Sequence, residues 1–199
     1  MSMGDGPTTR PSLLLRIRDT QDRTAWAEFV ELYAPLLHAY GLHRGLQDAD
    51  SADLAQEVLR RMVTASSRFR YDSSRGSFRG WLLAIARNEL TRFVKRRKRQ
   101  SLGSGDTEVG QLLQEQPDHR EERAFWDREY AWNLLHWAAR RVQPEFRETT
   151  WQAFWSTTVD GKSPQTVAAE LGISLGAVYI ARSRVSARIR EVVATVEGD

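Results

Sequence analysis

Hydrophobic residues recur every three or four positions along nearly the whole chain, which predicts an all-α protein. The first such stretch predicts a helix over residues 22–40, with Asp22 as its N-cap and a kink at Pro35. The same spacing predicts further helices over about 50–66, 78–99, 121–142 and 145–157. No run alternates with the period of two that half-buried strands require, so we expect no sheet.

Residues 100–120 break this pattern. They are rich in glycine, glutamine and acidic residues and lack a sustained hydrophobic stripe, which is typical of a flexible linker. The sequence therefore predicts two small helical domains. The expected segments are a tail with a first turn (1–21), a helical bundle (22–99), the linker (100–120) and a second domain (121–199).

The second domain carries a helix-turn-helix pattern over residues 163–190. Ser163 and Ser174 are the expected N-caps of its two helices. The small Ala168 lets the helices cross closely, Gly172 allows a left-handed turn, and Val178 fills the shared core.

The second helix of this motif is basic on its outer side, and no acidic residue lies between positions 178 and 190. Cations of this kind contact phosphates, and forked donors contact base edges. The pattern favours DNA binding; an ordinary helical hairpin is the alternative. The outer and neighbouring positions are Tyr179, Arg182, Ser183, Arg184, Ser186, Arg188 and Arg190.

Charge is distributed unevenly although the net charge is only +3. Residues 68–100 hold 11 basic and 2 acidic side chains, whereas residues 101–129 hold 3 basic and 8 acidic ones. A concentrated basic block indicates a nucleic-acid or anionic surface. Our hypothesis is that the acidic stretch stays off DNA or covers the basic block in the free protein.

Aromatic residues alternate with arginines in the basic block, at Phe69, Tyr71, Phe78 and Trp81. Aromatic side chains in a loop provide surfaces on which unstacked bases bind. The alternative is that the aromatic residues, Trp81 above all, pack in the core while the arginines are solvated.

Two motifs then resemble a known family. The run FRGWLLAIARNEL at 78–90 and the run DLAQEV at 53–58 resemble region 2 of bacterial RNA polymerase sigma factors. Together with the helix-turn-helix, the chain resembles the extracytoplasmic-function type of the sigma-70 superfamily, which has regions 2 and 4 only. The resemblance covers about 22–99 and 121–193.

The resemblance implies a promoter-specificity subunit that recognises the minus-ten and minus-thirty-five elements, melts promoter DNA and initiates transcription. The residues implied in binding core polymerase are Asp53, Leu54, Gln56, Glu57 and Arg60. Those implied at the minus-ten element are Phe69, Tyr71, Arg75, Phe78, Arg79, Arg87, Asn88, Thr91, Arg92 and Lys95. Those implied at the minus-thirty-five element are Ser174, Tyr179, Arg182, Ser183, Arg184, Ser186 and Arg188.

One motif departs from the family pattern. Family members often carry Lys-Ser-Arg after the valine of the recognition helix, whereas this chain has Tyr179, Ile180 and Ala181, followed by Arg182. The identity of the residues that contact the bases, and hence the promoter sequence, therefore does not follow from the family pattern.

The implied partners are promoter DNA, the clamp and flap regions of core RNA polymerase, and an anti-sigma protein. We expect no cofactor, no small-molecule substrate and no membrane insertion, and a cytoplasmic location, because no apolar run approaches a bilayer span. The chain has no cysteine, which excludes disulfides and zinc-thiolate sites.

Two other functions remain as alternatives. The first is a regulator that binds an operator without contacting polymerase. The second is an enzyme acting on DNA, which would need a nucleophile or metal ligands. The four histidines lack metal-ligand spacing, and Asp48, Asp50 and Asp53 lie at a helix start, where acidic residues favour the dipole. We therefore expect no catalytic activity.

Overall fold

The computed structural model describes residues 8–9, 11–66, 77–100 and 118–198 of the 199-residue chain. Most of these residues are helical, which confirms the all-α class. They form two compact units, which are described separately below. The first contains the residues up to Asn133 together with Glu197 and Gly198, and the second contains Leu134–Val196.

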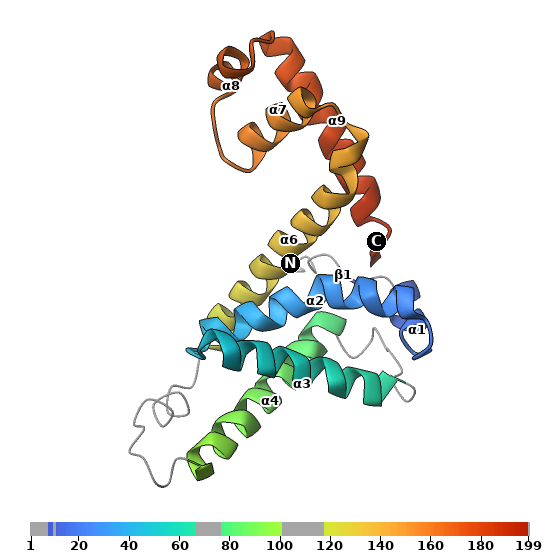
Figure 1. Cartoon of the computed structure of the whole chain (residues 1–199), viewed down its shortest axis with the longest axis vertical. Helices are drawn as coiled ribbons and strands as arrows, with labels where there is room; N and C mark the ends of the chain where they lie inside the picture. The colour runs from blue at the N-terminus through green and yellow to red at the C-terminus, as the bar shows by residue number, and fades with distance from the viewer. Residues whose placement is uncertain (1–7, 10, 67–76, 101–117, 199) are drawn as a thin grey trace, which may run out of the picture. The chain divides into compact units, whose positions relative to one another are not determined.

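The first unit is built mainly on three long helices (Figure 1): α2 (Arg23–His43), α3 (Asp48–Ser66) and α4 (Phe78–Gln100). The predicted cap is confirmed, since the Asp22 carboxylate accepts from the Ala25 amide at 2.9 Å. α2 continues through Pro35 and past Gly41, so it is longer than predicted.

The segment expected to be a tail contains an additional short helix, α1 (Pro11–Arg16). Leu13 and Leu14 on α1, and Ile17 just after it, are buried. Their burial explains why this segment folds onto the first unit.

Aromatic side chains from three helices form the centre of the first unit. The Phe78 ring lies edge-on to Phe29 and Tyr33, with ring centroids 6.0 and 5.6 Å apart. Tyr33 stacks on Tyr130 of α6 (His119–Val142) at 5.7 Å, and Tyr40 meets Trp126 of the same helix edge-on at 5.6 Å.

The division between the units therefore differs from the predicted boundary at residue 121. The first half of α6 belongs to the first unit because Trp126 and Tyr130 are buried there against α2. The central part of the predicted linker, residues 101–117, lies outside the described residues.

The second unit contains the predicted helix-turn-helix. α8 (Pro164–Leu171) and α9 (Leu175–Val193) begin at the predicted caps, where the hydroxyls of Ser163 and Ser174 each accept a backbone N–H at 3.1 Å. Gly172 has a φ of 64°, the left-handed conformation that the turn requires. Val167 and Val178 pack in one cluster against Ala168, as the pattern predicted.

The helix that completes this cluster starts later than predicted. Gln143–Glu145 form a short 3₁₀ turn, η2, and α7 spans Glu148–Thr158. Arg147 between them is extended, with ψ at 146°, and this separates the 3₁₀ turn from the helix. Trp151 is buried and stacks on Trp155 at 5.4 Å, which gives the tryptophan pair of α7 a packing role.

One small sheet was not predicted. β1 (Thr8–Thr9) pairs antiparallel with β2 (Glu197–Gly198) over two residues. A pair this short adds little stability and leaves the all-α class unchanged.

Gly41 is required by the close packing of α2 on α3. A Cβ at this position would lie 2.9 Å from the Ser51 Cα and 2.8 Å from its Oγ. We expect Gly41→Ala to lower the free energy of unfolding by about 1–3 kcal/mol, because the helix backbones must separate. Urea unfolding followed by circular dichroism measures the change.

The matched control is Gly176→Ala on α9, where the nearest atom to an added Cβ is 3.9 Å away. This variant should be at least as stable as the original chain, because alanine favours helix more than glycine does. Equal stability of the original chain and Gly41→Ala would contradict the packing argument.

Candidate nucleic-acid interface

One face of α4 presents polar and cationic side chains to solvent. The Ser77 hydroxyl caps this helix by accepting the Gly80 amide at 3.2 Å. Four of its exposed residues follow the helical repeat of three and four positions, so these four lie on one side. They are Asn88, Thr91, Arg92 and Lys95, all of which the sequence analysis implied at the minus-ten element.

Lys95 makes no ion pair with any residue that the structure describes, so its ammonium group is available to a phosphate. Arg92 is half-exposed and bonds the buried Glu89 carboxylate at 2.8 Å. The Thr91 hydroxyl donates to the Arg87 carbonyl within the helix at 2.9 Å. Asn88 and Lys95 are exposed on this face, and their role in binding DNA stays a prediction.

Two of the predicted minus-ten residues lie in the interior of the first unit. Phe78 is 1% exposed within the aromatic centre. Arg79 is 5% exposed, with its guanidinium 4.5 Å from the centre of the Tyr130 ring and 3.5 Å from the Asp127 carboxylate. Sequence patterning alone does not separate these buried residues from their exposed neighbours. The predicted residues Phe69, Tyr71 and Arg75 lie outside the described residues.

A buried carboxylate joins α2, α4 and α6. Glu122 is 1% exposed and accepts from the Tyr40 hydroxyl at 2.6 Å and from Arg44 Nη1 at 3.0 Å. Arg87 donates Nε to its other oxygen at 2.6 Å, and Arg87 Nη2 also contacts that oxygen. Arg87, predicted as a DNA contact, is therefore already paired within the unit.

Burial tends to raise the pKa of Glu122, but hydrogen bonds from Tyr40 and Arg87 and the charges of Arg87 and Arg44 outweigh it. The pKa lies below the usual 4.5. The same environment raises the pKa of Tyr40, through burial and its hydrogen bond to Glu122. At neutral pH Glu122 is thus ionised and Tyr40 is a neutral donor.

The described part of the acidic stretch pairs with the basic block. Glu122 binds Arg87, and Asp127 lies beside Arg79. The hypothesis that the acidic stretch stays off DNA or covers the basic block in the free protein stays a prediction, because residues 101–117 lie outside the described residues. The sequence pattern did not single out Glu122 as a structural residue, although it lies four residues before Trp126 and eight before Tyr130, a spacing that indicates an acidic residue on a buried face.

The predicted polymerase-binding residues on α3 divide into two groups. Leu54 is 1% exposed and belongs to the core, whereas Asp53, Gln56 and Arg60 are exposed. Glu57 accepts Arg60 Nε at 2.9 Å and Nη2 at 2.7 Å. The hydrogen bond from Arg60 outweighs partial burial and holds the pKa of Glu57 below its usual value.

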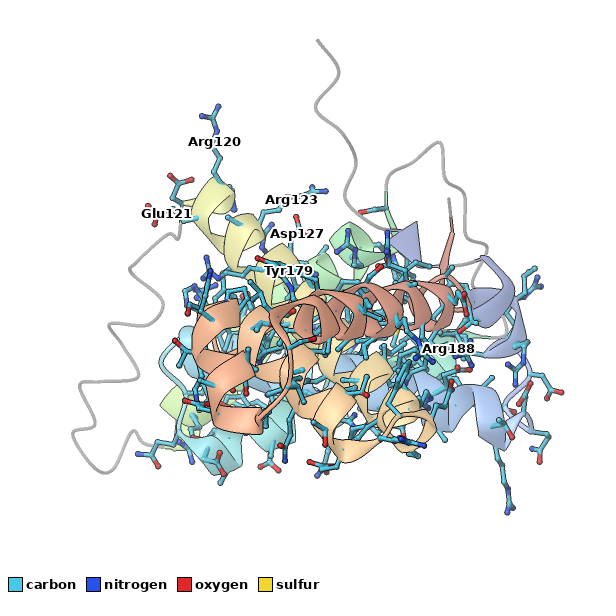
Figure 2. All side chains as sticks on the ribbon, turned by 90° about the horizontal axis from the view of Figure 1, so that it is seen from above. Arg120, Glu121, Arg123, Asp127, Tyr179 and Arg188 are labelled. Carbon is cyan, nitrogen blue, oxygen red and sulfur yellow. The ribbon has the colours of Figure 1, made fainter. Side chains whose placement is uncertain are left out.

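The residues predicted on α9 also differ in their surroundings. Ser174 is used as the helix cap, and Arg188 is held by Glu145 at 2.7 Å and Glu191 at 2.9 Å. Tyr179 is 49% exposed, on the part of α9 visible in Figure 2. The remaining predicted residues are Ser183 and Arg184, which are exposed, and Arg182 and Ser186, which are half-buried.

In the described part of the chain, no group of three or more histidine or acidic side chains is arranged to hold a metal ion. None of the helices described combines the length and the apolar character needed to cross a bilayer.

Comparisons with known proteins show which proteins this chain is similar to. Residues 29–100 match the family model for sigma-70 region 2. The ECF RNA polymerase sigma factor SigE of Mycolicibacterium smegmatis is 26% identical over 182 residues, which is 90% of this chain and 65% of that protein. The match thus spans less than two thirds of the relative's own length.

Two solved structures also align along most of the chain. A structure of the RsbN–BldN complex aligns at 18% identity with a TM-score of 0.34, over 90% of this chain and 98% of that one. A structure of CnrH in complex with the cytosolic domain of CnrY aligns at 18% identity with a TM-score of 0.30, over 92% and 96%. TM-scores this low do not establish a shared fold.

The Glu122 cluster makes stability depend on pH. The pKa of Glu122 is lower in the folded chain than the usual 4.5. The stability that its charge contributes is therefore fully present above pH 4.5 and is lost as the pH falls through the pKa of the folded state. We expect Glu122→Gln to lower the free energy of unfolding at pH 7 by about 3 kcal/mol, since two arginines lose their counter-charge. The difference should shrink steadily as the pH falls below 4.5. Urea unfolding across a pH series measures it.

The control is Glu121→Gln. Glu121 is exposed, and Figure 2 shows its side chain extending outward from the first turn of α6. This variant should follow the original chain at every pH. A pH-independent loss in Glu122→Gln would contradict the role assigned to the charge.

Proposed function

We propose that this chain is a member of the extracytoplasmic-function group of the sigma-70 family and a promoter-specificity subunit of bacterial RNA polymerase. In this role it recognises the minus-ten and minus-thirty-five elements, opens promoter DNA and performs no catalysis itself. It acts in the cytoplasm, where transcription takes place.

The observation that carries this proposal is the exposed face of α4. That face lies within the segment matching sigma-70 region 2, and it presents Asn88, Thr91, Arg92 and Lys95 together. Amide, hydroxyl and cationic groups on one helix face suit contacts to both phosphates and base edges.

Opening DNA requires free energy that such a surface can supply in part. Unstacking a base costs a few kcal/mol. Stacking the flipped base on an aromatic side chain returns about 1–3 kcal/mol. Phe69 and Tyr71, outside the described residues, are the proposed stacking partners, while cations such as Lys95 hold the backbone.

Region 4 would provide the second anchor. α8 and α9 form the helix-turn-helix, and α9 carries Arg182, Arg184 and Arg190 with no acidic residue before Glu191. A helix with this charge binds the major groove and its flanking phosphates.

Core polymerase would dock on the exposed side of α3, through Asp53, Gln56 and Arg60. The clamp region of its largest subunit is the proposed contact there, and its flap region is the proposed contact of the second unit. An anti-sigma protein is a further proposed partner, on the strength of the likeness to sigma factors.

An operator-binding regulator is the second candidate, because the helix-turn-helix alone suffices for duplex binding. The two functions differ in their need for core polymerase. Transcription from a genomic promoter library by core polymerase plus this protein tests the first function directly, and no initiation from any promoter would exclude it.

Changing the α3 surface separates the two functions further. Gln56→Arg should weaken binding to core polymerase at least tenfold, because it places a cation in the proposed interface. Fluorescence titration of labelled core polymerase measures the affinity. Gln47→Arg, an exposed change just before α3, is the matched control and should bind normally. Unchanged binding by Gln56→Arg would favour the operator-binding regulator.

Lys95 is the proposed phosphate contact on α4. Lys95→Ala should weaken binding of the polymerase holoenzyme to all promoters by a similar factor and should reduce the salt dependence by about one phosphate contact. Filter binding at several salt concentrations measures both quantities. Arg18→Ala, an exposed cation outside α4, should leave them unchanged. A promoter-specific effect of Lys95→Ala would contradict the assignment.

A further inference from the structure

The outward face of α9 is apolar over its first turns. Leu175, Tyr179 and Ile180 are 38%, 49% and 61% exposed, and Ile180 is the most exposed of the large hydrophobic residues that the structure describes. Successive residues of an α-helix are rotated by about 100° around its axis. Tyr179 and Ile180 therefore lie on the side of α9 that faces away from the buried Val178 and Val185. Isolated exposed hydrophobic residues are common, but three within six residues form a surface.

Gly176 lies at the centre of this face and has no structural reason to be glycine. A Cβ there would meet only the Ser174 Oγ, at 3.9 Å. Its φ is not positive, so as the second residue of α9 it has a backbone conformation that alanine also adopts. A bare backbone at this point allows another molecule to approach the helix closely.

Cations surround this apolar face without lying at its centre. Arg182 is half-buried at its edge, and Arg184 lies with its guanidinium carbon 6.0 Å from the centre of the Phe146 ring. Arg190 donates to the Ser186 carbonyl at 3.2 Å, two turns further along α9. Arg188 is bound by two carboxylates, so it adds little free positive charge.

This arrangement fits duplex DNA, in which phosphates flank a groove floor of base edges. On the major-groove floor the one apolar group among the four bases is the thymine 5-methyl. The N-terminal residues of a recognition helix are those that contact base edges. The first turns of α9 offer no arginine, asparagine or glutamine for bidentate contacts, since their outward residues are Gly176, Tyr179 and Ile180.

We propose that Tyr179 and Ile180 select thymine methyl groups in the upstream promoter element, with Gly176 allowing the close approach. This inference rests on the proposed function and extends it to specificity. The upstream element is therefore defined by the positions of thymine methyls rather than by arginine contacts to guanine. Ile180 and Tyr179 are the specificity-determining residues, and Gly176 is a positioning residue.

The test uses the holoenzyme of core polymerase and the full chain. Duplexes randomised upstream are selected for binding, and the enriched element is then rebuilt with deoxyuridine in place of each thymidine in turn. Loss of one contacted methyl should weaken binding about fourfold, as expected for burial of one methyl-sized group. At one such position, Ile180→Ser should bind thymidine and deoxyuridine duplexes equally.

Gly176→Ala should weaken binding to the selected duplex at least tenfold while its thermal stability is unchanged or raised. If Gly176 served only the fold, Gly176→Ala would instead lower the thermal stability and leave binding to the selected duplex unchanged. Val30→Ala, which changes an exposed branched residue on α2, is the control and should alter neither quantity.

Several outcomes would overturn the inference. Equal affinity for thymidine and deoxyuridine at every position would do so, as would normal binding by Gly176→Ala. Weakened core-polymerase binding by Ile180→Ser, with unchanged DNA preference, would assign the face to a protein partner instead. Each of these results is compatible with promoter-directed transcription, so failure of the inference is distinct from failure of the proposed function.

Discussion

The first unit depends on one buried charge. Removing a carboxylate from water costs several kcal/mol unless strong donors replace the lost hydration. Glu122 receives donors from Tyr40, Arg44 and Arg87, which come from two other helices. Because none of these partners is adjacent in sequence, satisfying this one group requires that α2, α4 and the start of α6 pack together.

This requirement divides the cations of the basic block into two classes. Arg87 and Arg79 face carboxylates from α6 and serve the fold. Lys95 is exposed and Arg92, although bonded to Glu89, is half-exposed, and these are the cations that we propose for a polyanionic ligand. The net charge of a segment is therefore a poor measure of its capacity to bind nucleic acid, because internal carboxylates neutralise part of it before any ligand arrives.

Much of the fold follows from local chemistry and was predictable. Ser77, Ser163 and Ser174 cap helices because each hydroxyl reaches an amide three residues ahead, and Gly172 adopts the left-handed turn for which it is suited. The site residues were less predictable. Phe78 and Leu54 matched a functional motif by type and position, yet both lie in the core, because a motif does not distinguish a residue that supports a surface from one that forms it.

The sequence by itself determined most of the helices, the serine caps and the glycine turn of the helix-turn-helix, since each depends on contacts within about four residues. Only the tertiary structure decided which side chains remain exposed. The Tyr40–Glu122 hydrogen bond spans 82 positions and the Arg87–Glu122 bond spans 35, distances over which no local pattern extends. The same holds for Gly176, because its freedom from internal contacts becomes evident only when the surroundings of α9 are known.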